Sequence, residues 1–297
     1  MKLLKLAAID IGSNAVRLLV NDIIDEDGNP YFKKASLIRV PIRLGADVFK
    51  TGKISEQNVE RLVDAMKAYK LLMQVHQATG YRAFATSAMR EASNGEEVAA
   101  HIRSETGVDL QIIDGMIEAE LLFATRISEQ LDMSKSYLYV DVGGGSTELT
   151  LFSKNKSLAS RSFKIGTIRI LSGQVSEDKW KELKEWLSKV SKGIKDMTVI
   201  GTGGNANKIS KILNGKKRDK AFVRYSHLKD LYKELSVIDE EERMRRYSMR
   251  PDRADVIVPA AKIFTTVMKV SGAKEMFVPK VGLSDGMIRW MYRKDKF

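Results

Sequence analysis

The spacing of apolar residues predicts strands and helices that follow one another along the whole chain. Apolar runs at 5–11 and 15–20 predict two strands joined by a short turn. A second pair of this kind occurs at 137–140 and 149–152. Two such pairs, one early and one near the middle of the chain, predict an internally duplicated protein.

The remaining segments complete an α/β pattern. Ser55 opens a segment whose apolar residues share one helical face, which predicts a helix that ends by Gly80. A long helix is predicted from Arg250 onward, because Pro251 suits the first helical turn. Further strands are predicted at 31–44, 82–86, 110–113, 158–165, 198–200 and 276–278, and further helices at 96–106, 176–192, 206–213 and 283–292.

Three consecutive glycines, Gly143, Gly144 and Gly145, separate the two central strands. Without Cβ atoms, successive backbone amides can turn into one concavity that binds an anion. The hydroxyls of Ser146 and Thr147 add further donors. The stretch therefore predicts a phosphate-binding turn, and a tight hairpin without a ligand is the alternative.

Two carboxylates flank this turn, Asp141 at the end of the first strand and Glu148 at the start of the second. Carboxylates beside bound phosphates repel them unless a cation intervenes. Mg²⁺ is the hard cation that commonly bridges phosphate oxygens and one or two carboxylates. The turn therefore predicts a divalent metal as well as phosphate.

The earlier pair of strands repeats this arrangement. Asp10 ends the first strand, and Gly12, Ser13 and Asn14 form the turn before the next one. Two phosphate turns of one kind predict two lobes, with the turns facing each other across a cleft.

A third glycine turn, with Gly203 and Gly204, joins a strand to a helix. A helix N-terminus reached through glycines favours an anion or a nucleotide. The turn lacks the Gly-Lys-Ser/Thr of a P-loop and the full spacing of a dinucleotide fingerprint, which disfavours those two folds.

Three further side chains are candidates with plain alternatives. Arg90 follows a short strand, where its guanidinium could grip a phosphate bidentately, and an arginine on a helix surface is the alternative. Glu118 and Glu120 lie in the first turn of a helix, where acids favour the helix dipole. A glutamate that points into the cleft could instead orient or deprotonate a water molecule.

Composition narrows the partners. The 297 residues suit two domains, and a net charge of +12 favours an anionic partner. Basic runs at 216–220 and 243–246 could line a track for a polyanion, but no nucleic-acid recognition motif occurs. The absence of cysteine excludes disulfides and thiolate sites and fits the cytoplasm. The apolar N-terminal run meets Asp10 too early for a signal peptide or a membrane span.

Together these motifs resemble the exopolyphosphatase and guanosine pentaphosphate phosphohydrolase (Ppx/GppA) family of the actin-like ATPase superfamily. Any one motif is weak evidence, whereas seven in the family's order are specific. The matching segments are a first phosphate motif at 10–18, an arginine segment at 85–94, a catalytic-glutamate segment at 115–119, a second phosphate motif at 141–148, an adenosine-type turn at 201–204, and closing motifs at 253–256 and 282–286.

The resemblance implies two actin-like (RNase H-like) ATPase domains, each with a mixed sheet flanked by helices, and an active-site cleft between them. Domain I is expected at 1–125 and domain II at 126–297, the short form of the family. Two departures bear on substrate choice. Ser284 stands where the family usually has an arginine or an acid, and Asn205 where it often has threonine.

The resemblance also implies an activity, the hydrolysis of the terminal phosphoanhydride of inorganic polyphosphate. Arg90 and the glycine turns would hold phosphates, and Glu118 would orient the attacking water and accept its proton. Asp141 and Glu148 would hold Mg²⁺ or another divalent cation, with Asp10 acting through water.

Three alternatives stay open at this point: a pppGpp 5′-phosphohydrolase, a phosphotransferase of the same fold, and a non-catalytic regulator that binds polyphosphate or nucleotides. The family often forms dimers, which implies a homodimer. From the sequence itself we expect a cytoplasmic protein that binds no membrane and is not a nucleic-acid-binding protein.

Overall fold

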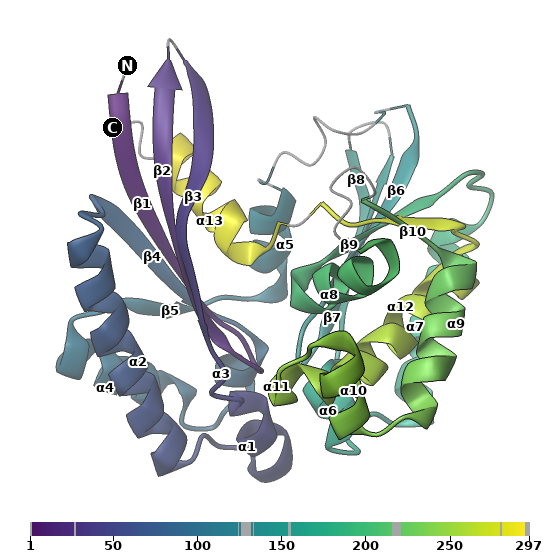
Figure 1. The fold of residues 1–297 in the computed structure, drawn as a ribbon, viewed down its shortest axis with the longest axis horizontal. Helices are drawn as coiled ribbons and strands as arrows, with labels where there is room; N and C mark the ends of the chain where they lie inside the picture. Colours follow the sequence, from purple (N-terminus) through teal and green to yellow (C-terminus); the bar gives the residue numbers. More distant parts are fainter. Residues whose placement is uncertain are drawn as a thin grey trace. The chain divides into compact units, whose positions relative to one another are not determined.

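The computed structural model describes the chain apart from residues 1, 27, 124, 126–131, 133, 154–155, 216–220, 280 and 295–297. The chain forms two compact units (Figure 1). Unit 1 comprises Met1–Thr125 with Leu283–Phe297, and unit 2 comprises Arg126–Gly282. Each unit has one sheet of its own.

Unit 1 is built on a five-stranded sheet in the order β3-β2-β1-β4-β5. The first three strands form an antiparallel meander, whereas β4 and β5 run parallel to β1. Parallel neighbours need crossover connections, which the helices supply. The elements are β1 (Lys2–Ile11), β2 (Val16–Glu26), β3 (Asn29–Val40), α1 (Leu44–Thr51), α2 (Glu56–Val75), β4 (Gly80–Ala85), α3 (Ser87–Glu91), α4 (Gly95–Thr106), β5 (Leu110–Ile112), α5 (Gly115–Phe123) and α13 (Leu283–Lys294).

Unit 2 has a six-stranded sheet in the order β10-β11-β9-β6-β7-β8. Its meander is β6-β7-β8, and β9 pairs parallel with β6. The elements are β6 (Ser136–Val142), β7 (Thr147–Ser153), β8 (Lys156–Phe163), α6 (Thr167–Leu171), α7 (Glu177–Ser191), β9 (Thr198–Thr202), α8 (Gly203–Asn214), β10 (Phe222–Arg224), α9 (Tyr225–Val237), α10 (Glu240–Tyr247), α11 (Pro251–Ala254), α12 (Ile257–Ser271) and β11 (Glu275–Phe277).

The two sheets share one topology. In both, an antiparallel meander is followed by a short helix, a long helix and a strand that returns parallel to the first strand. In both, the turn between the first two strands carries the predicted phosphate motif. The duplication predicted from the two turns therefore extends through both sheets.

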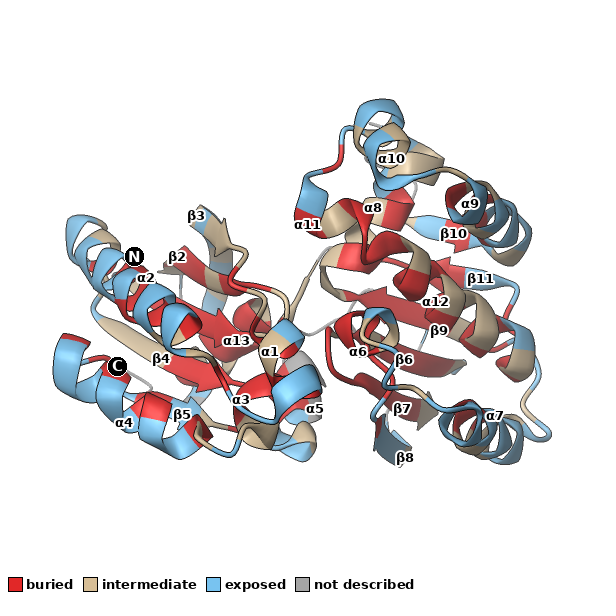
Figure 2. Cartoon of the chain, turned by 90° about the horizontal axis from the view of Figure 1, so that it is seen from below, coloured by how far each residue is buried: buried red, intermediate tan, exposed pale blue. Residues whose placement is uncertain are grey.

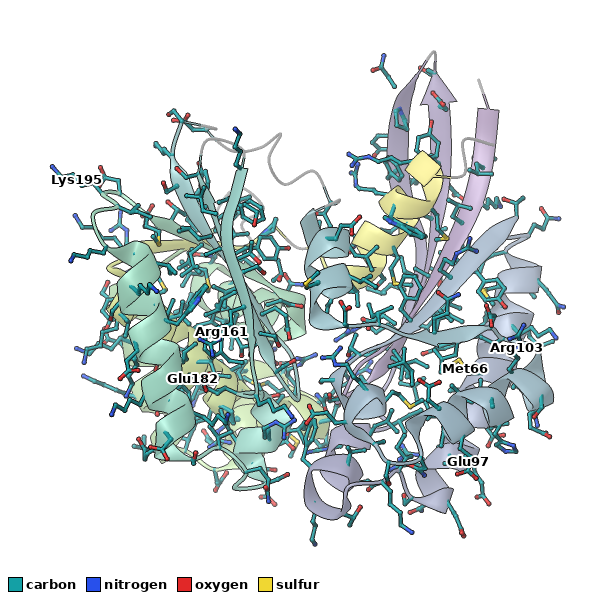
Figure 3. All side chains as sticks on the ribbon, turned by 180° about the vertical axis from the view of Figure 1, so that it is seen from behind. Met66, Glu97, Arg103, Arg161, Glu182 and Lys195 are labelled. Atoms are coloured by element: carbon teal, nitrogen blue, oxygen red, sulfur yellow. The ribbon has the colours of Figure 1, made fainter. Side chains whose placement is uncertain are left out.

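Apolar side chains on the strands and on the inner helix faces form the cores, while the outer helix faces are exposed (Figure 2). In unit 2 the central helix α12 packs against α7 and α9 and buries Ile263, Phe264 and Val267 completely. Burial of each such side chain stabilises the fold by about 1.5–3 kcal/mol. On the surface, Arg161 of β8 pairs with Glu182 of α7 (Figure 3).

The last helix, α13, belongs to unit 1, whereas the predicted domain limits placed it in domain II. It packs on β1, β2 and α5. Its apolar residues Met287, Ile288 and Met291 are buried, and Gly286 lies so close to the Leu121 carbonyl that a Cβ would overlap it. Charge pairing with β3 adds a further contact, because Lys34 Nζ lies 2.7 Å from an Asp285 oxygen.

Two predicted elements differ from the structure in their boundaries. Helix α2 ends at Val75, and Gly80 instead begins β4. The helix predicted from Arg250 is broken into α11 and α12. Two features favour the break: Pro259 has no amide to offer the Asp255 carbonyl, and the Ala254 carbonyl accepts a hydrogen bond from Arg243 Nη1 at 3.0 Å.

The short helices α1 and α6 and the longer α9 were not predicted at all. Helices of five to eight residues carry too little periodicity to be recognised. No helix in the described part of the chain combines the length and the apolar character that crossing a membrane requires.

Candidate active site

The conformation of the triple-glycine turn of unit 2 is fixed by a hydrogen bond across the turn and by donors to its carbonyl groups. The Gly143 amide donates to the Ser146 carbonyl at 3.0 Å, which closes the turn between β6 and β7. The Gly144 carbonyl accepts from the amides of Ile168 and Arg169, at 2.8 and 3.1 Å. These donors belong to the first turn of α6. With its carbonyls engaged on one side, the turn can present its amides on the other.

A buried arginine completes this support. Arg169 Nε donates to the Gly145 carbonyl at 2.8 Å, and the arginine is only 8% exposed. Gly166, just before α6, lies against the backbone of Gly144 and Gly145, where a Cβ would overlap both residues. Helix α6 can thus approach the turn only because Gly166 has no side chain.

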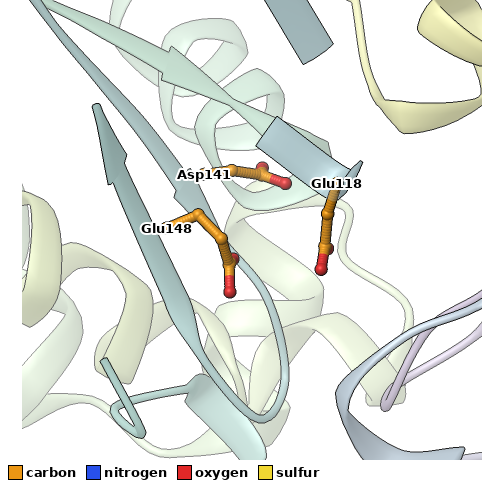
Figure 4. A group of neighbouring side chains, drawn as sticks. All are labelled: Glu118, Asp141 and Glu148. Carbon is orange, nitrogen blue, oxygen red and sulfur yellow. The ribbon is translucent and has the colours of Figure 1, made fainter. Parts of the chain in front are cut away.

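The two acids beside the turn face each other across the strand pair. Asp141 and Glu148 are direct partners in the β6–β7 register, so their side chains project from one face of the sheet. An oxygen of each carboxylate lies within 4.8 Å of the other. Figure 4 shows both side chains, together with Glu118 of unit 1.

Neighbouring hydroxyls orient these carboxylates. Glu148 Oε1 accepts hydrogen bonds from Ser146 Oγ at 2.6 Å and from Ser162 Oγ at 2.9 Å. Asp141 Oδ1 accepts from Thr202 Oγ1 at 2.9 Å. Hydroxyl donors behind carboxylates are the usual support of metal-binding acids, because they fix the carboxylate plane. The oxygen-only donor set suits a hard divalent cation.

The turn of unit 1 repeats the backbone geometry. The Gly12 amide donates to the Ala15 carbonyl at 3.1 Å, in the same pattern as in the second turn. The Ser13 carbonyl accepts from the Gly45 amide at 2.8 Å, at the start of α1. The Asn14 carbonyl accepts from the Arg43 amide at 3.1 Å. Both turns are therefore held from behind by the helix that follows the meander.

The charges beside the first turn differ. Asp10 is paired in the β1–β2 register with Arg17, where the second turn has a glutamate. The Arg17 guanidinium donates to Asp10 Oδ2 at 2.6 Å, and Asp10 is 4% exposed. Asp10 therefore already has a cationic partner, and its predicted metal role through water stays a prediction.

Arg90 lies on α3 and is half-buried. Its Nη1 donates to the Ile113 carbonyl at 2.5 Å. This bond links α3 to the end of β5. Its predicted contact with phosphate stays a prediction.

The two glutamates of α5 differ in how far their side chains are buried. Asp114 caps this helix, because its Oδ1 accepts from the amides of Met116 and Ile117 at 2.8 and 2.9 Å. Glu118 is 7% exposed, whereas Glu120 is exposed. Burial therefore distinguishes Glu118 from Glu120, while Asp114 caps the helix N-terminus.

The third turn lies next to the second in the sheet of unit 2. Gly203 has φ +85°, a conformation that suits glycine, and it follows Thr202, whose hydroxyl binds Asp141. Arg253 lies against Gly204 and donates to the Asn205 side chain. Parallel strands β6 and β9 end at one edge, which brings the predicted Gly203 and Gly204 beside the triple-glycine turn.

The arginines of the basic run at 243–246 form hydrogen bonds and ion pairs within unit 2. Arg243 donates to the carbonyls of Leu235, Ile238 and Ala254. Arg245 pairs with Glu242, and Arg246 pairs with Glu242 and Glu234. These contacts account for the run at 243–246, so its predicted role as a polyanion track has no support. The run at 216–220 lies outside the described residues.

Sequence reasoning missed several supporting residues. Arg169, Ser162 and Thr202 were not singled out, although each donates to the turn or to its acids. The register Asp141–Glu148–Ser162 across three strands was the available signal for Ser162, but it required correct pairing of β7 with β8. Nothing in the local sequence marks Arg169 as buried.

Comparisons with known proteins agree on one family. The profile of the Ppx/GppA phosphatase family matches residues 23–294. A bifunctional 3-dehydroquinate synthase/phosphatase of Fusobacterium nucleatum is 28% identical over 287 residues, 90% of this chain and 43% of its own length. Exopolyphosphatase 2 of Mycobacterium tuberculosis is 33% identical over 175 residues, 57% of this chain and 54% of its own. The chain thus spans about half the length of these two relatives.

Solved structures match along the whole chain. The Ppx/GppA family member of Aquifex aeolicus is 26% identical, covers 100% of both chains and has a TM-score of 0.77. An exopolyphosphatase from Cytophaga hutchinsonii is 25% identical, covers 98% of both chains and has a TM-score of 0.84. These matches confirm the predicted fold class, two actin-like domains with mixed sheets flanked by helices. The chain belongs to the Ppx/GppA phosphatase family.

Proposed function

We propose that this protein is an exopolyphosphatase, which hydrolyses the terminal phosphoanhydride of inorganic polyphosphate. The observation that carries the proposal is the pair of hydroxyl-supported carboxylates, Asp141 and Glu148, beside a glycine turn whose carbonyls are engaged from behind. Such a turn suits phosphate, and the acids suit a cation that neutralises it. Family relatives named exopolyphosphatase support the substrate class.

Binding of the chain end falls to the glycine turns. The amides of 143–146, with Ser146 and Thr147, take the terminal phosphate, and Gly12, Ser13 and Asn14 of unit 1 contact its neighbour. Arg90 clamps one phosphate through its guanidinium, and Gly203 and Gly204 face the following phosphate. Phosphoryl transfer needs positioning and charge neutralisation more than covalent help, which a preorganised set of donors provides.

Glu118 acts as the general base. It orients a water molecule in line with the terminal phosphorus and accepts the water proton as the oxygen attacks. The bond from the terminal phosphorus to the bridging oxygen breaks, and orthophosphate and a chain one phosphate shorter leave.

Asp141 and Glu148 are the residues that would hold Mg²⁺ or another divalent cation, because their carboxylates are neighbours and carry hydroxyl support. When bound, the cation supplies positive charge that offsets the charge on the phosphate oxygens. Asp10, which is paired with Arg17, would contribute only through water.

The experiment is orthophosphate release from long-chain polyphosphate by the wild type and by Glu118→Gln. We expect the variant to lose about 10²–10⁴-fold in turnover, the usual contribution of a general base, and to retain polyphosphate binding. Glu120→Gln, an exposed glutamate on the same helix, is the matched control. Equal turnover in Glu118→Gln would remove Glu118 from this role.

Three related measurements separate the rival functions. Faster release of phosphate from pppGpp favours the 5′-phosphohydrolase, and transfer of labelled phosphate to ADP favours a phosphotransferase. Polyphosphate binding without release of phosphate favours a regulator.

We further propose that the protein is a cytoplasmic homodimer. Sedimentation measures the mass of the assembly, which for a dimer is twice that of the 33.4 kDa chain.

A further inference from the structure

A cavity of about 850 Å³ lies in unit 2, away from the glycine turns. It opens where β9 and β11 begin, where β10 meets α9 and where α12 ends. Thr198 lines it at the start of β9, and Thr202 at the other end of that strand binds Asp141. Four residues of strand at ~3.3 Å each separate these positions by about 13 Å. The cavity is therefore distinct from the candidate active site.

Positive charge dominates the cavity wall. Lys135, Lys269 and Lys274 line it, and within the described chain neither Lys269 nor Lys274 forms an ion pair. Lys135 has a loose partner in Asp132 at 3.8 Å, outside the cavity. Arg224 and Glu275, paired across β10 and β11 at 3.7 Å, offset each other. Asp196 is the remaining acid of the lining, so the balance favours an anion.

The N-terminus of α9 adds to this charge. Helix α9 has 13 residues, no acid in its first turn and no side-chain cap. The Tyr225 amide donates to the Lys274 carbonyl at 2.9 Å, and Ser226, the next residue of the first turn, lines the cavity. The partial positive charge of an uncapped helix start thus acts on the same space as the lysines.

The floor is apolar. Met197, Met268 and Ala273 line the cavity and are at most 5% exposed, and Tyr225 stands beside them. Because Met197 and Met268 are almost completely buried, the half-buried ring of Tyr225 is the surface here that suits a flat ring better than a hydrated inorganic anion. Pockets of this volume commonly take molecules of nucleotide size.

We propose that this cavity is a second ligand site, which binds a phosphorylated small molecule of the nucleotide class. The phosphates face Lys135, Lys269, Lys274 and the start of α9, and the base lies against the ring of Tyr225. Phosphate is the chemistry shared with inorganic tripolyphosphate, whereas the Tyr225 ring favours the nucleotide.

The test is calorimetric binding of ATP to protein that carries Glu148→Gln, so that turnover does not interfere. The triple variant Lys135→Ala, Lys269→Ala, Lys274→Ala in that background removes three charges from the cavity. Lys181→Ala, Lys184→Ala, Lys189→Ala removes three charges from the exposed face of α7 and is the matched control. We expect about a tenfold or greater loss of ATP affinity in the first and none in the second, since 1.4 kcal/mol corresponds to tenfold. Equal affinities in the two triple variants would overturn the site.

Ser226→Asp separates binding from folding. An acid in the first turn stabilises the helix start, so the melting temperature should rise or stay constant while ATP binding is lost to charge repulsion. Undiminished ATP binding in this variant contradicts the proposal. Tripolyphosphate is the second probe: if it binds the cavity as tightly as ATP does, the nucleotide assignment is wrong. Neither result depends on polyphosphate hydrolysis, so the proposed function and this site can fail separately.

Discussion

The two predicted phosphate turns have the same backbone hydrogen bonds and differ in the charges beside them. Each turn has its first glycine amide bonded to the carbonyl three residues on, and each is held from behind by a short helix. Beside the first turn, Asp10 is neutralised by Arg17, whereas beside the second, Asp141 stands opposite Glu148. Of these two turns, the one in unit 2 therefore has two acids in register, the arrangement that suits a cation.

The largest expected effect comes from giving the second turn the charge of the first. Glu148→Arg places a guanidinium opposite Asp141, which would pair with it and exclude the cation. We expect orthophosphate release to fall by about 10²–10³-fold or more, as when a group that stabilises transition-state charge is lost. Glu185→Arg, on the exposed face of α7, is the control. Wild-type turnover in Glu148→Arg would show that the second carboxylate beside this turn is not needed for catalysis.

A second variant removes the positive charge that neutralises Asp10 beside the first turn. Arg17→Met leaves the buried Asp10 carboxylate without its partner at 2.6 Å. Breaking a buried pair from one side costs about 3–5 kcal/mol, and the exposed fraction of Arg17 places the expected loss near the lower end, at about 3 kcal/mol. Urea denaturation measures the loss. Arg161→Met, which breaks the exposed pair with Glu182, should cost about 1 kcal/mol or less, and an equal loss in both variants would contradict the argument.

The third prediction concerns the supports behind the turns. The second turn is supported by backbone amides of α6 and also by the Arg169 side chain, whereas the first is supported by the backbone amides of Arg43 and Gly45. Arg169→Met leaves the Gly145 carbonyl without that donor, a cost of about 1–3 kcal/mol. We expect the KM for polyphosphate to rise by about ten- to a hundredfold, with a smaller change in kcat.

Its control is Arg43→Gly. This variant keeps the amide that binds the Asn14 carbonyl and relieves the left-handed backbone at φ +63°. Activity should stay at the wild-type level. A large loss of activity there, with little loss in Arg169→Met, would show that the two supports had been assigned the wrong way round.

The smallest effect tests the likeness of the two turns. A Cβ on Gly12 would lie 3.3 Å from the Ala15 carbonyl oxygen, and one on Gly143 would lie 3.2 Å from the Ser146 oxygen. Each alanine variant should lose about 1 kcal/mol of stability, because a backbone oxygen has to shift slightly. Thermal denaturation of both variants gives the comparison, and losses that differ by several kcal/mol would mean that the turns are not equivalent.

Much of this arrangement could be predicted from the sequence, because its signals are local. The strand–glycine–strand motifs at Gly12 and Gly143 carry their own turn chemistry, and the order of motifs gave the family and the fold. Asp141 and Glu148 could be recognised as a pair because a four-residue turn between adjacent strands leaves them opposite each other.

The rest depends on contacts between distant segments. Arg17 lies in the first motif, but its pairing with Asp10 follows from the strand register and not from the spacing alone. The first turn of α6 meets the glycine turn only after β8 has returned along β7. For the arginines at 243–246, charge suggested a ligand, whereas three carbonyls at helix ends and two glutamates account for them.

Because α13 packs in unit 1, it determines which fragments of the chain contain a complete unit. Only unit 2 is a continuous stretch, so a fragment that begins near residue 132 and stops at 282 contains a whole sheet with all its covering helices. The N-terminal 125 residues expressed alone leave bare the apolar surface of β1 and β2 that Met287, Ile288 and Met291 cover. Loss of a few C-terminal turns by proteolysis would therefore damage the half of the protein that is synthesised first.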